Sequence, residues 1–106
     1  MNWLVLEDYS QIQKALLQTE PFLVLKHSTR CSISRMVKSR FERTFDCKTI
    51  ELFYLDLLRF RSLSNQLERD FKIKHESPQV MLIKGGACIY HASHNAIDAD
   101  VIKGKL

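Results

Sequence analysis

Apolar residues occur along this 106-residue chain in two kinds of pattern. Some form short, nearly unbroken runs, which are typical of strands inside a sheet. Others recur every three or four residues, which is typical of a helix with one buried face. The runs predict strands at 3–6, 22–26, 50–58, 79–84 and 87–92. The helical spacing predicts helices at 9–17, 31–45, 62–71 and 95–103.

The predicted helices each have an apolar stripe that we expect to face a core. The stripes comprise Tyr9, Ile12, Leu16 and Leu17; then Ile33, Met36, Val37, Phe41 and Phe45; then Leu63, Leu67 and Phe71; and last Ala96, Val101 and Ile102. Gly85-Gly86 between the last two strands is a strong signal for a tight hairpin. The hairpin makes that pair antiparallel, whereas alternating strands and helices indicate parallel strands with crossovers.

The resulting order is β-α-β-α-β-α-β-β-α, and a chain of this length predicts a single domain over residues 1–106. We therefore expect an α/β fold of three layers, with a central mixed sheet and helices on both faces. This is the thioredoxin-like arrangement. In that arrangement the reactive cysteine follows the second strand, and Cys31 stands at this place in the chain.

Cys31 lies where the second strand hands over to a helix. Unpaired backbone N–H groups at a helix start favour negative charge, and cysteines there form thiolates readily. Three residues later stands Ser34, so the motif is Cys-x-x-Ser where dithiol oxidoreductases have Cys-x-x-Cys. The pattern predicts a thiol–disulfide exchanger with one reactive cysteine. A lone cysteine is otherwise more often a small buried hydrophobe.

The net charge of +4 is concentrated around this cysteine. Six basic residues lie between Lys26 and Phe45 against the single acid Glu42: Lys26, Arg30, Arg35, Lys38, Arg40 and Arg43. They either form a solvated helix face or an electropositive rim that attracts an acidic ligand. We expect no nucleic-acid partner, because the aromatic residues have core positions and no recognition motif is present.

The cysteines also indicate a compartment. Cys31, Cys47 and Cys88 are odd in number and widely spaced, which argues against a disulfide scaffold and suits a reducing cytosol. The apolar residues 3–6 are too few for a signal peptide, and no apolar run is long enough for a bilayer, so we expect no membrane association. No Cys or His pair has metal-ligand spacing, and we expect no bound cofactor.

Three sequence blocks resemble the bacillithiol-system YtxJ-like family, the monothiol bacilliredoxins. They are Lys26-His-Ser-Thr-Arg-Cys-Ser-Ile-Ser, then Tyr54-Leu-Asp-Leu-Leu with Ser64-Asn, then His75-Glu-Ser-Pro-Gln, and Ala92-Ser-His accompanies them. One departure is Ser32, where the family usually has proline. The resemblance implies an enzyme whose cysteine thiolate removes bacillithiol from protein mixed disulfides. The cysteine would carry the bacillithiol until a second bacillithiol, acting as co-substrate, resolves the adduct.

On this interpretation Cys31 is the nucleophile, and Ser34 donates a hydrogen bond to its thiolate. Thr29, Arg30 and Ser32 surround it, and Arg30 could pair with the malate carboxylates of bacillithiol; Lys26 and Arg35 could do so at longer range. Pro78 is expected to be the cis-proline of the fold, with the Ser77 backbone presented to the bound thiol ligand. The further candidates are His27 and His75, which could tune the thiolate, and Asp56, either a proton acceptor or a strand-end cap.

Three alternatives remain open at this point. Cys31 could be modified without turnover in a binding or redox-sensing module. A glutaredoxin-like iron–sulfur carrier is disfavoured, because the glycine of its Cys-Gly-Phe-Ser motif is absent. Cys–His hydrolysis is disfavoured because no oxyanion hole or orienting third residue is indicated. Cys47 is predicted to lie a helix length from Cys31, too far to bridge directly, and Cys88 is expected to serve packing.

Overall fold

The computed structural model describes residues 2–47 and 49–106. Its strands are β1 (Trp3–Val5), β2 (Phe22–His27), β3 (Glu51–Asp56), β4 (Gln79–Lys84) and β5 (Ala87–Ser93). Its helices are α1 (Ser10–Ala15), α2 (Ser32–Thr44), α3 (Arg61–Phe71) and α4 (Ala99–Lys103), with a short 3-10 helix η1 (His94–Ala96) before α4. The predicted α/β order is confirmed, although several elements are shorter than predicted: β3 ends at Asp56 and α1 at Ala15.

The five strands form one mixed sheet in the order β1-β3-β2-β4-β5. β3 pairs in parallel with both β1 and β2, while β4 is antiparallel to β2 and to β5. The alternation of strands and helices did not indicate that β4 runs against β2. The Gly85-Gly86 hairpin is as predicted, since both residues have positive φ, 62° and 81°, as this two-residue turn requires.

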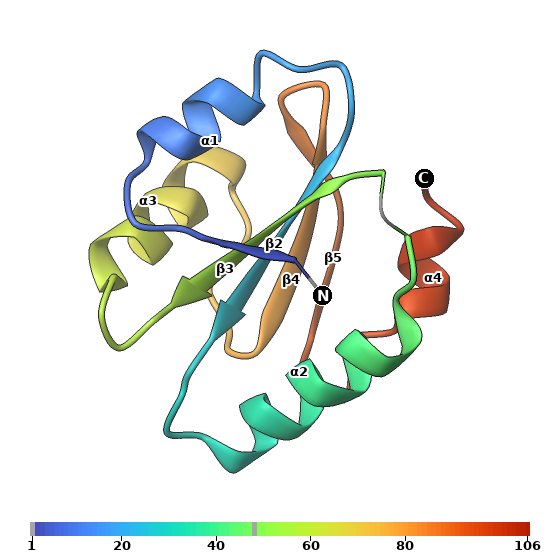
Figure 1. The fold of residues 1–106 in the computed structure, drawn as a ribbon. Coiled ribbons are helices and arrows are strands. Elements are labelled where there is room, and N and C mark those ends of the chain that lie inside the picture. Colours follow the sequence, from blue (N-terminus) through green and yellow to red (C-terminus); the bar gives the residue numbers. More distant parts are fainter. Residues whose placement is uncertain (1, 48) are drawn as a thin grey trace.

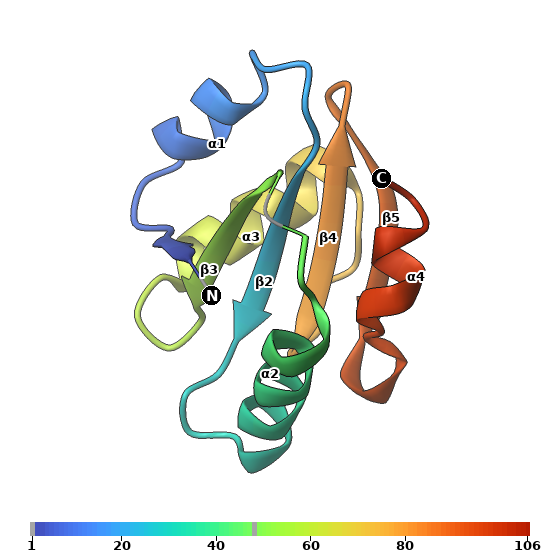
Figure 2. The same cartoon turned by 45° about the vertical axis from the view of Figure 1, so that its right-hand side comes forward.

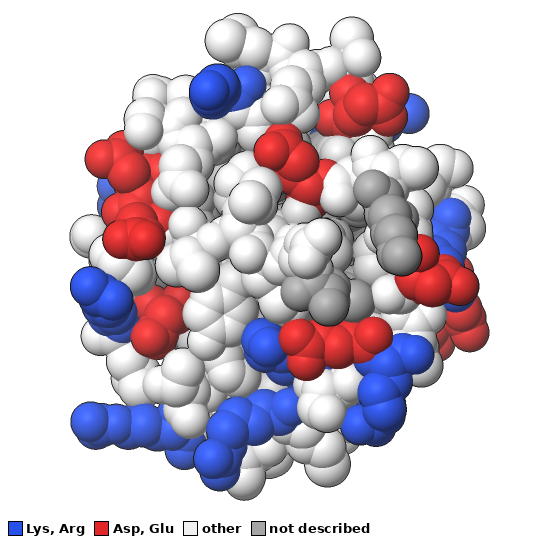
Figure 3. Space-filling model, in the orientation of Figure 1, with Lys and Arg blue, Asp and Glu red and all other residues white. Residues whose placement is uncertain are grey.

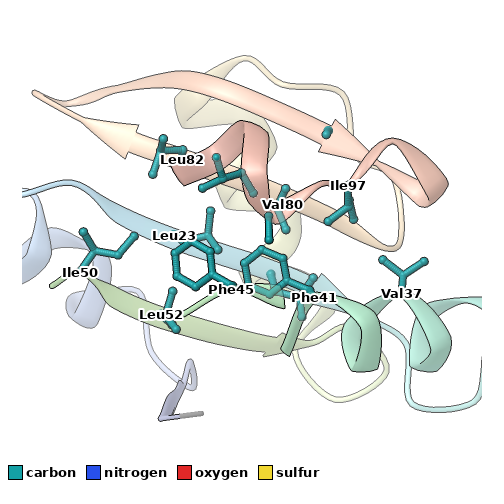
Figure 4. Close-up of a cluster of buried hydrophobic side chains, with 13 residues drawn as sticks. Leu23, Val37, Phe41, Phe45, Ile50, Leu52, Val80, Leu82 and Ile97 are labelled. Atoms are coloured by element: carbon teal, nitrogen blue, oxygen red, sulfur yellow. The ribbon is translucent and has the colours of Figure 1, made fainter. Parts of the chain in front are cut away.

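Helices cover both faces of the sheet, which gives three layers (Figure 1). α1 and α3 pack on one face, and α2 and α4 lie side by side on the other (Figure 2). Each face has its own buried core because successive side chains of a strand point to opposite faces. The core beneath α2 is built around Phe41 and Phe45, whose rings stack 4.8 Å apart between the helix and the leucines of β2 and β3 (Figure 4).

Some apolar positions were wrongly assigned to the core. Ile33 and Met36 of α2 are 51% and 55% exposed, because Ser34, Val37 and Phe41 form the face that meets the sheet. Leu17 lies beyond the end of α1 and is exposed. At the C-terminus Ile97, Ala99 and Ile102 are buried, whereas Ala96 and Val101 are exposed. The break between η1 and α4 shifts the buried face away from the predicted one.

Within the described ranges, no helix combines the length and the apolar character needed to cross a bilayer.

Candidate functional site around Cys31

Cys31 is the N-cap residue of α2, four residues after the end of β2. Its backbone is extended, with φ −97° and ψ 120°, and its carbonyl accepts the Arg35 N–H at 3.0 Å. Its own N–H donates to the Ser28 carbonyl at 3.2 Å, which closes the turn. The side chain is half-buried. Cys31 therefore lies at a helix start, as the strand-to-helix pattern predicted, and it is partly exposed to solvent.

Ser34 lies beneath this turn and is fully buried. Its Oγ accepts the Ser28 N–H at 3.2 Å and lies 2.7 Å from His27 Nδ1. Among the residues described, no hydrogen bond joins Ser34 to the Cys31 sulfur. The structure thus places Ser34 at the predicted motif position and adds two contacts that the sequence did not indicate. Both of them hold the turn that carries Cys31.

The remaining residues of the turn point to solvent. Thr29, Arg30, Ser32 and Arg35 are all exposed. Lys and Arg side chains gather along the lower edge of the molecule in Figure 3, where Figure 1 shows the β2–α2 turn and the start of α2. In the described part of the chain, no ion pair includes Arg30 or Arg35. These two guanidinium groups are therefore available to an anion that approaches Cys31.

The Ser77–Pro78 peptide bond is cis, as predicted. Pro78 is buried, Ser77 is half-buried, and the Pro78 carbonyl accepts the His94 N–H at 2.9 Å. Because Gln79 pairs with Lys26 near the end of β2, the 75–78 segment and the β2–α2 turn lie at the same end of the sheet. Ser77 Oγ is buried, with no hydrogen-bond partner in the described residues.

Lys26 does not belong to the basic rim. It is fully buried on the α3 face of the sheet, with Nζ 3.4 Å from the Ser64 carbonyl oxygen and 3.4 Å from His75 Nδ1. The Ser64 hydroxyl lies 3.0 Å from the same ring nitrogen. Burial lowers the pKa of Lys26 to about 8, against a smaller opposing effect of Glu68. Lys26 therefore cannot reach a bound malate, contrary to the prediction.

This buried cluster was missed by reasoning along the chain. Ser64 comes from the second of the sequence blocks that carry the family resemblance, His75 and Gln79 come from the third, and the fold brings them to Lys26 of the first. Gln79 donates to the Lys74 carbonyl at 3.0 Å, and its Oε1 is buried with no partner among the described residues. The one signal in the sequence that could have indicated this cluster is that its residues belong to separate motifs of the same family.

His27 and Asp56 lie on the opposite, α2 face at the ends of two paired strands. The His27 ring is only 4% exposed, and its centroid is 5.4 Å from that of Tyr54. Burial lowers the pKa of His27, with Lys38 as a second cause. Asp56 accepts the Leu58 N–H at 3.0 Å, so its carboxylate caps the end of β3.

The other two cysteines are far from this site or turned away from it. All three are free thiols, and α2 separates Cys31 from Cys47; its 13 residues correspond to about 20 Å. Burial raises the pKa of Cys88, which donates to the Tyr90 carbonyl at 3.3 Å. Two cavities of about 340 and 420 Å³ occur beside the C-terminal half of α2, and Cys31 lines neither of them. Among the described residues, the half-exposed Cys31 thiol therefore has no disulfide partner.

A thioredoxin-like sheet with one half-exposed cysteine at the start of α2 defines the class of single-cysteine thioredoxin-fold proteins. Structure comparison supports the thioredoxin fold. A candidate oxidoreductase with a thioredoxin fold superimposes with a TM-score of 0.83 at 25% identity, covering 94% of this chain and 89% of that chain. Thioredoxins from Malassezia sympodialis and Trypanosoma brucei brucei superimpose with TM-scores of 0.73 and 0.75 at 16% and 8% identity. Each of these comparisons covers 98% of this chain and 87% of the other.

The sequence profile of the monothiol bacilliredoxin family BrxC matches residues 5–102. The chain belongs to this family. Family and fold together support a role of the thiol oxidoreductase kind.

Proposed function

We propose that this protein removes bacillithiol from protein mixed disulfides. The Cys31 thiolate attacks the bacillithiol sulfur, the electron pair of the broken S–S bond leaves with the protein sulfur, and that sulfur takes up a proton. Cys31 then carries bacillithiol as a mixed disulfide. A second bacillithiol thiolate attacks this adduct, which yields oxidised bacillithiol and returns the Cys31 thiolate. Electrons balance because one disulfide is consumed and one is formed in each step.

The single observation that carries the proposal is the place of Cys31. It is half-exposed at the N-cap of a 13-residue helix, and Cys47 lies at the opposite end of that helix. Cys88 pairs with Ile83 near the hairpin, at the end of β4 opposite the one that lies near Cys31. A disulfide needs Cα atoms within about 7 Å, so neither intramolecular partner is available without large rearrangement. Resolution by a small thiol therefore fits this chain better than resolution by a second cysteine. The free thiols accord with a reducing cytosol, where we propose that the protein acts.

The surroundings of Cys31 suggest how the substrates are held. Arg30 and Arg35 are exposed beside the thiol and are suited to the carboxylates of bacillithiol. Thr29 and Ser32 offer hydroxyl groups in the same turn. The Ser77 backbone, next to the cis bond, is suited to pair with an extended substrate segment. Because Cys31 is half-exposed, a substrate sulfur on the surface of another protein can approach it.

The test is mass spectrometry of the reduced protein before and after incubation with oxidised bacillithiol, followed by reduced bacillithiol. We expect one bacillithiol on Cys31, and its removal by the second reagent. A bacillithiolated protein is then supplied in excess with reduced bacillithiol. Many turnovers per Cys31 are expected from the wild type and from Cys88→Ser, and none from Cys31→Ser. A single adduct without turnover would instead identify a redox-sensing module.

A further inference from the structure

Behind Cys31, His27 and Ser34 form a buried polar pair that the proposed exchange steps do not require. Ser34 Oγ lies 2.7 Å from His27 Nδ1 and accepts the Ser28 N–H at 3.2 Å. Ser34 is fully buried and His27 nearly so. Two buried positions directly beneath the turn that carries Cys31 are therefore occupied by polar side chains.

The hydrogen-bonding capacity of Ser34 limits what the pair can do. A serine hydroxyl has one hydrogen to donate and two lone pairs to accept with. The Ser28 N–H occupies one lone pair. If His27 carries its proton on Nδ1, that N–H occupies the second lone pair and the Ser34 hydrogen remains to be donated. If the proton is on Nε2, the Ser34 hydrogen is used by Nδ1.

The helix geometry indicates where the remaining hydrogen would go. Cys31 is the N-cap residue, and Ser34 is the third residue of α2. At a helix start the side chain of the third residue can reach back to the N-cap residue, as in the capping box. Burial of Ser34 keeps water from competing for its hydrogen. Among the described residues Ser34 makes no hydrogen bond to the Cys31 sulfur. A thiolate is a stronger acceptor than a neutral thiol, so we expect this bond to form only when the sulfur is ionised.

We propose that His27 is a positioning residue, which donates its Nδ1–H to Ser34 so that the Ser34 hydroxyl donates to the Cys31 thiolate. This inference rests on the proposed function, in which Cys31 acts as a thiolate. When the mixed disulfide is resolved, the electron pair of the S–S bond arrives on Cys31 Sγ. The Ser34 hydrogen bond stabilises that charge, and no proton is transferred. Burial lowers the pKa of His27, so the ring is neutral near neutral pH and carries a single N–H.

Nitrogen-15 NMR of the reduced protein at neutral pH reads the tautomer directly, and we expect the His27 proton on Nδ1. The thiolate fraction is measured through the rate of Cys31 alkylation by iodoacetamide, with Cys47 and Cys88 replaced by serine. Ser34→Ala and His27→Leu are each expected to lower the thiolate-to-thiol ratio about tenfold. The double variant should fall no further than Ser34→Ala, because both changes remove the same hydrogen bond.

His27→Asn is the matched conservative variant, since its side-chain amide can donate to Ser34 from the position of Nδ1. It should retain most of the wild-type thiolate ratio, which a packing role of the ring would not predict. A proton on Nε2, additive losses in the double variant, or an unchanged ratio in Ser34→Ala would each overturn the inference. None of these measurements uses bacillithiol. Failure of the proposed function would therefore appear as missing turnover in a protein whose His27–Ser34 pair still behaves as described.

Discussion

Replacing Lys26 by methionine should make this protein more stable at neutral pH. The ammonium group is fully buried, and its two contacts are both 3.4 Å long. Methionine retains an unbranched apolar side chain of similar length and needs no polar partner. It leaves His75 Nδ1 with its 3.0 Å contact to the Ser64 hydroxyl. The Ser64 carbonyl lies inside α3, where helix carbonyls accept the N–H four residues on.

The magnitude follows from the pKa of Lys26. Burial lowers this pKa from 10.5 to about 8. Each pKa unit corresponds to about 1.4 kcal/mol, so keeping the group protonated in the folded state costs up to about 3 kcal/mol. Apolar replacement of buried charged groups has stabilised other proteins by about 1–4 kcal/mol. We therefore expect Lys26→Met to raise the free energy of unfolding by about 1–3 kcal/mol at neutral pH.

Urea unfolding followed by circular dichroism measures this difference, and its pH dependence is a second test. Between about pH 8 and 10.5 the folded protein loses the Lys26 proton while the unfolded chain keeps it. The free energy of unfolding of the wild type should therefore rise with pH across this window, relative to Lys26→Met. The gap between the two proteins should close at the upper end.

The exposed Lys84 offers the control, since Lys84→Met removes a charge without removing a buried one. It should leave the free energy of unfolding within about 0.5 kcal/mol of the wild type. If Lys26→Met proves less stable than the wild type at neutral pH, or if the gap is the same at every pH, the reasoning is wrong. Either result would mean that the cluster compensates the buried ammonium far better than its contact lengths indicate.

Three further predictions concern the site and its surroundings. Ser32→Pro should raise the free energy of unfolding in urea by about 0.4–1 kcal/mol, because proline suits the first position of a helix and Cys31 already has the extended backbone that precedes proline; a loss of stability would count against this. Arg30→Gln should slow reaction with bacillithiol about two- to fivefold at low salt and less at high salt, whereas Arg43→Gln at the other end of α2 should not. Burial lowers the pKa of His75 below 6.5, so the unfolded chain takes up the proton first and the free energy of unfolding should fall as the pH drops below that value; His75→Gln should show a shallower fall.

The order of elements could be predicted from the chain alone because local pattern determines it. Strands buried on both faces are continuously apolar, as in Phe22–His27 up to its last two residues, and helices repeat their apolar residues with helical spacing. The Gly85-Gly86 pair predicted a tight turn, and both residues have the positive φ that such a turn requires. The position of Cys31 at the start of α2 followed from the same pattern. The direction of β4 did not, because strand pairing depends on contacts between distant segments.

The sequence pattern also did not predict which side chains around the site are exposed to solvent. Ile33 and Met36 fit the helical stripe of α2, yet the sheet covers only the face that contains Val37 and Phe41. α2 has apolar residues on two neighbouring faces, and either face could be buried as far as the sequence shows. Packing against β2 and β3 determines which face is buried. Lys26 shows the reverse case, since a charged residue at the end of an apolar run is fully buried.

The sequence by itself determined the class of fold, the family and the place of Cys31 at a helix start, because each depends on residue types at short, fixed spacings. Tertiary structure alone decided what lies around Cys31. It placed Ser34 against His27, brought the partly buried His75 to the buried Lys26 and Ser64, and left Arg30 exposed to solvent. The physical reason is that a side chain's partner is chosen by strand register and by the helix packed on each face of the sheet. Those are set by the whole core and not by neighbours along the chain.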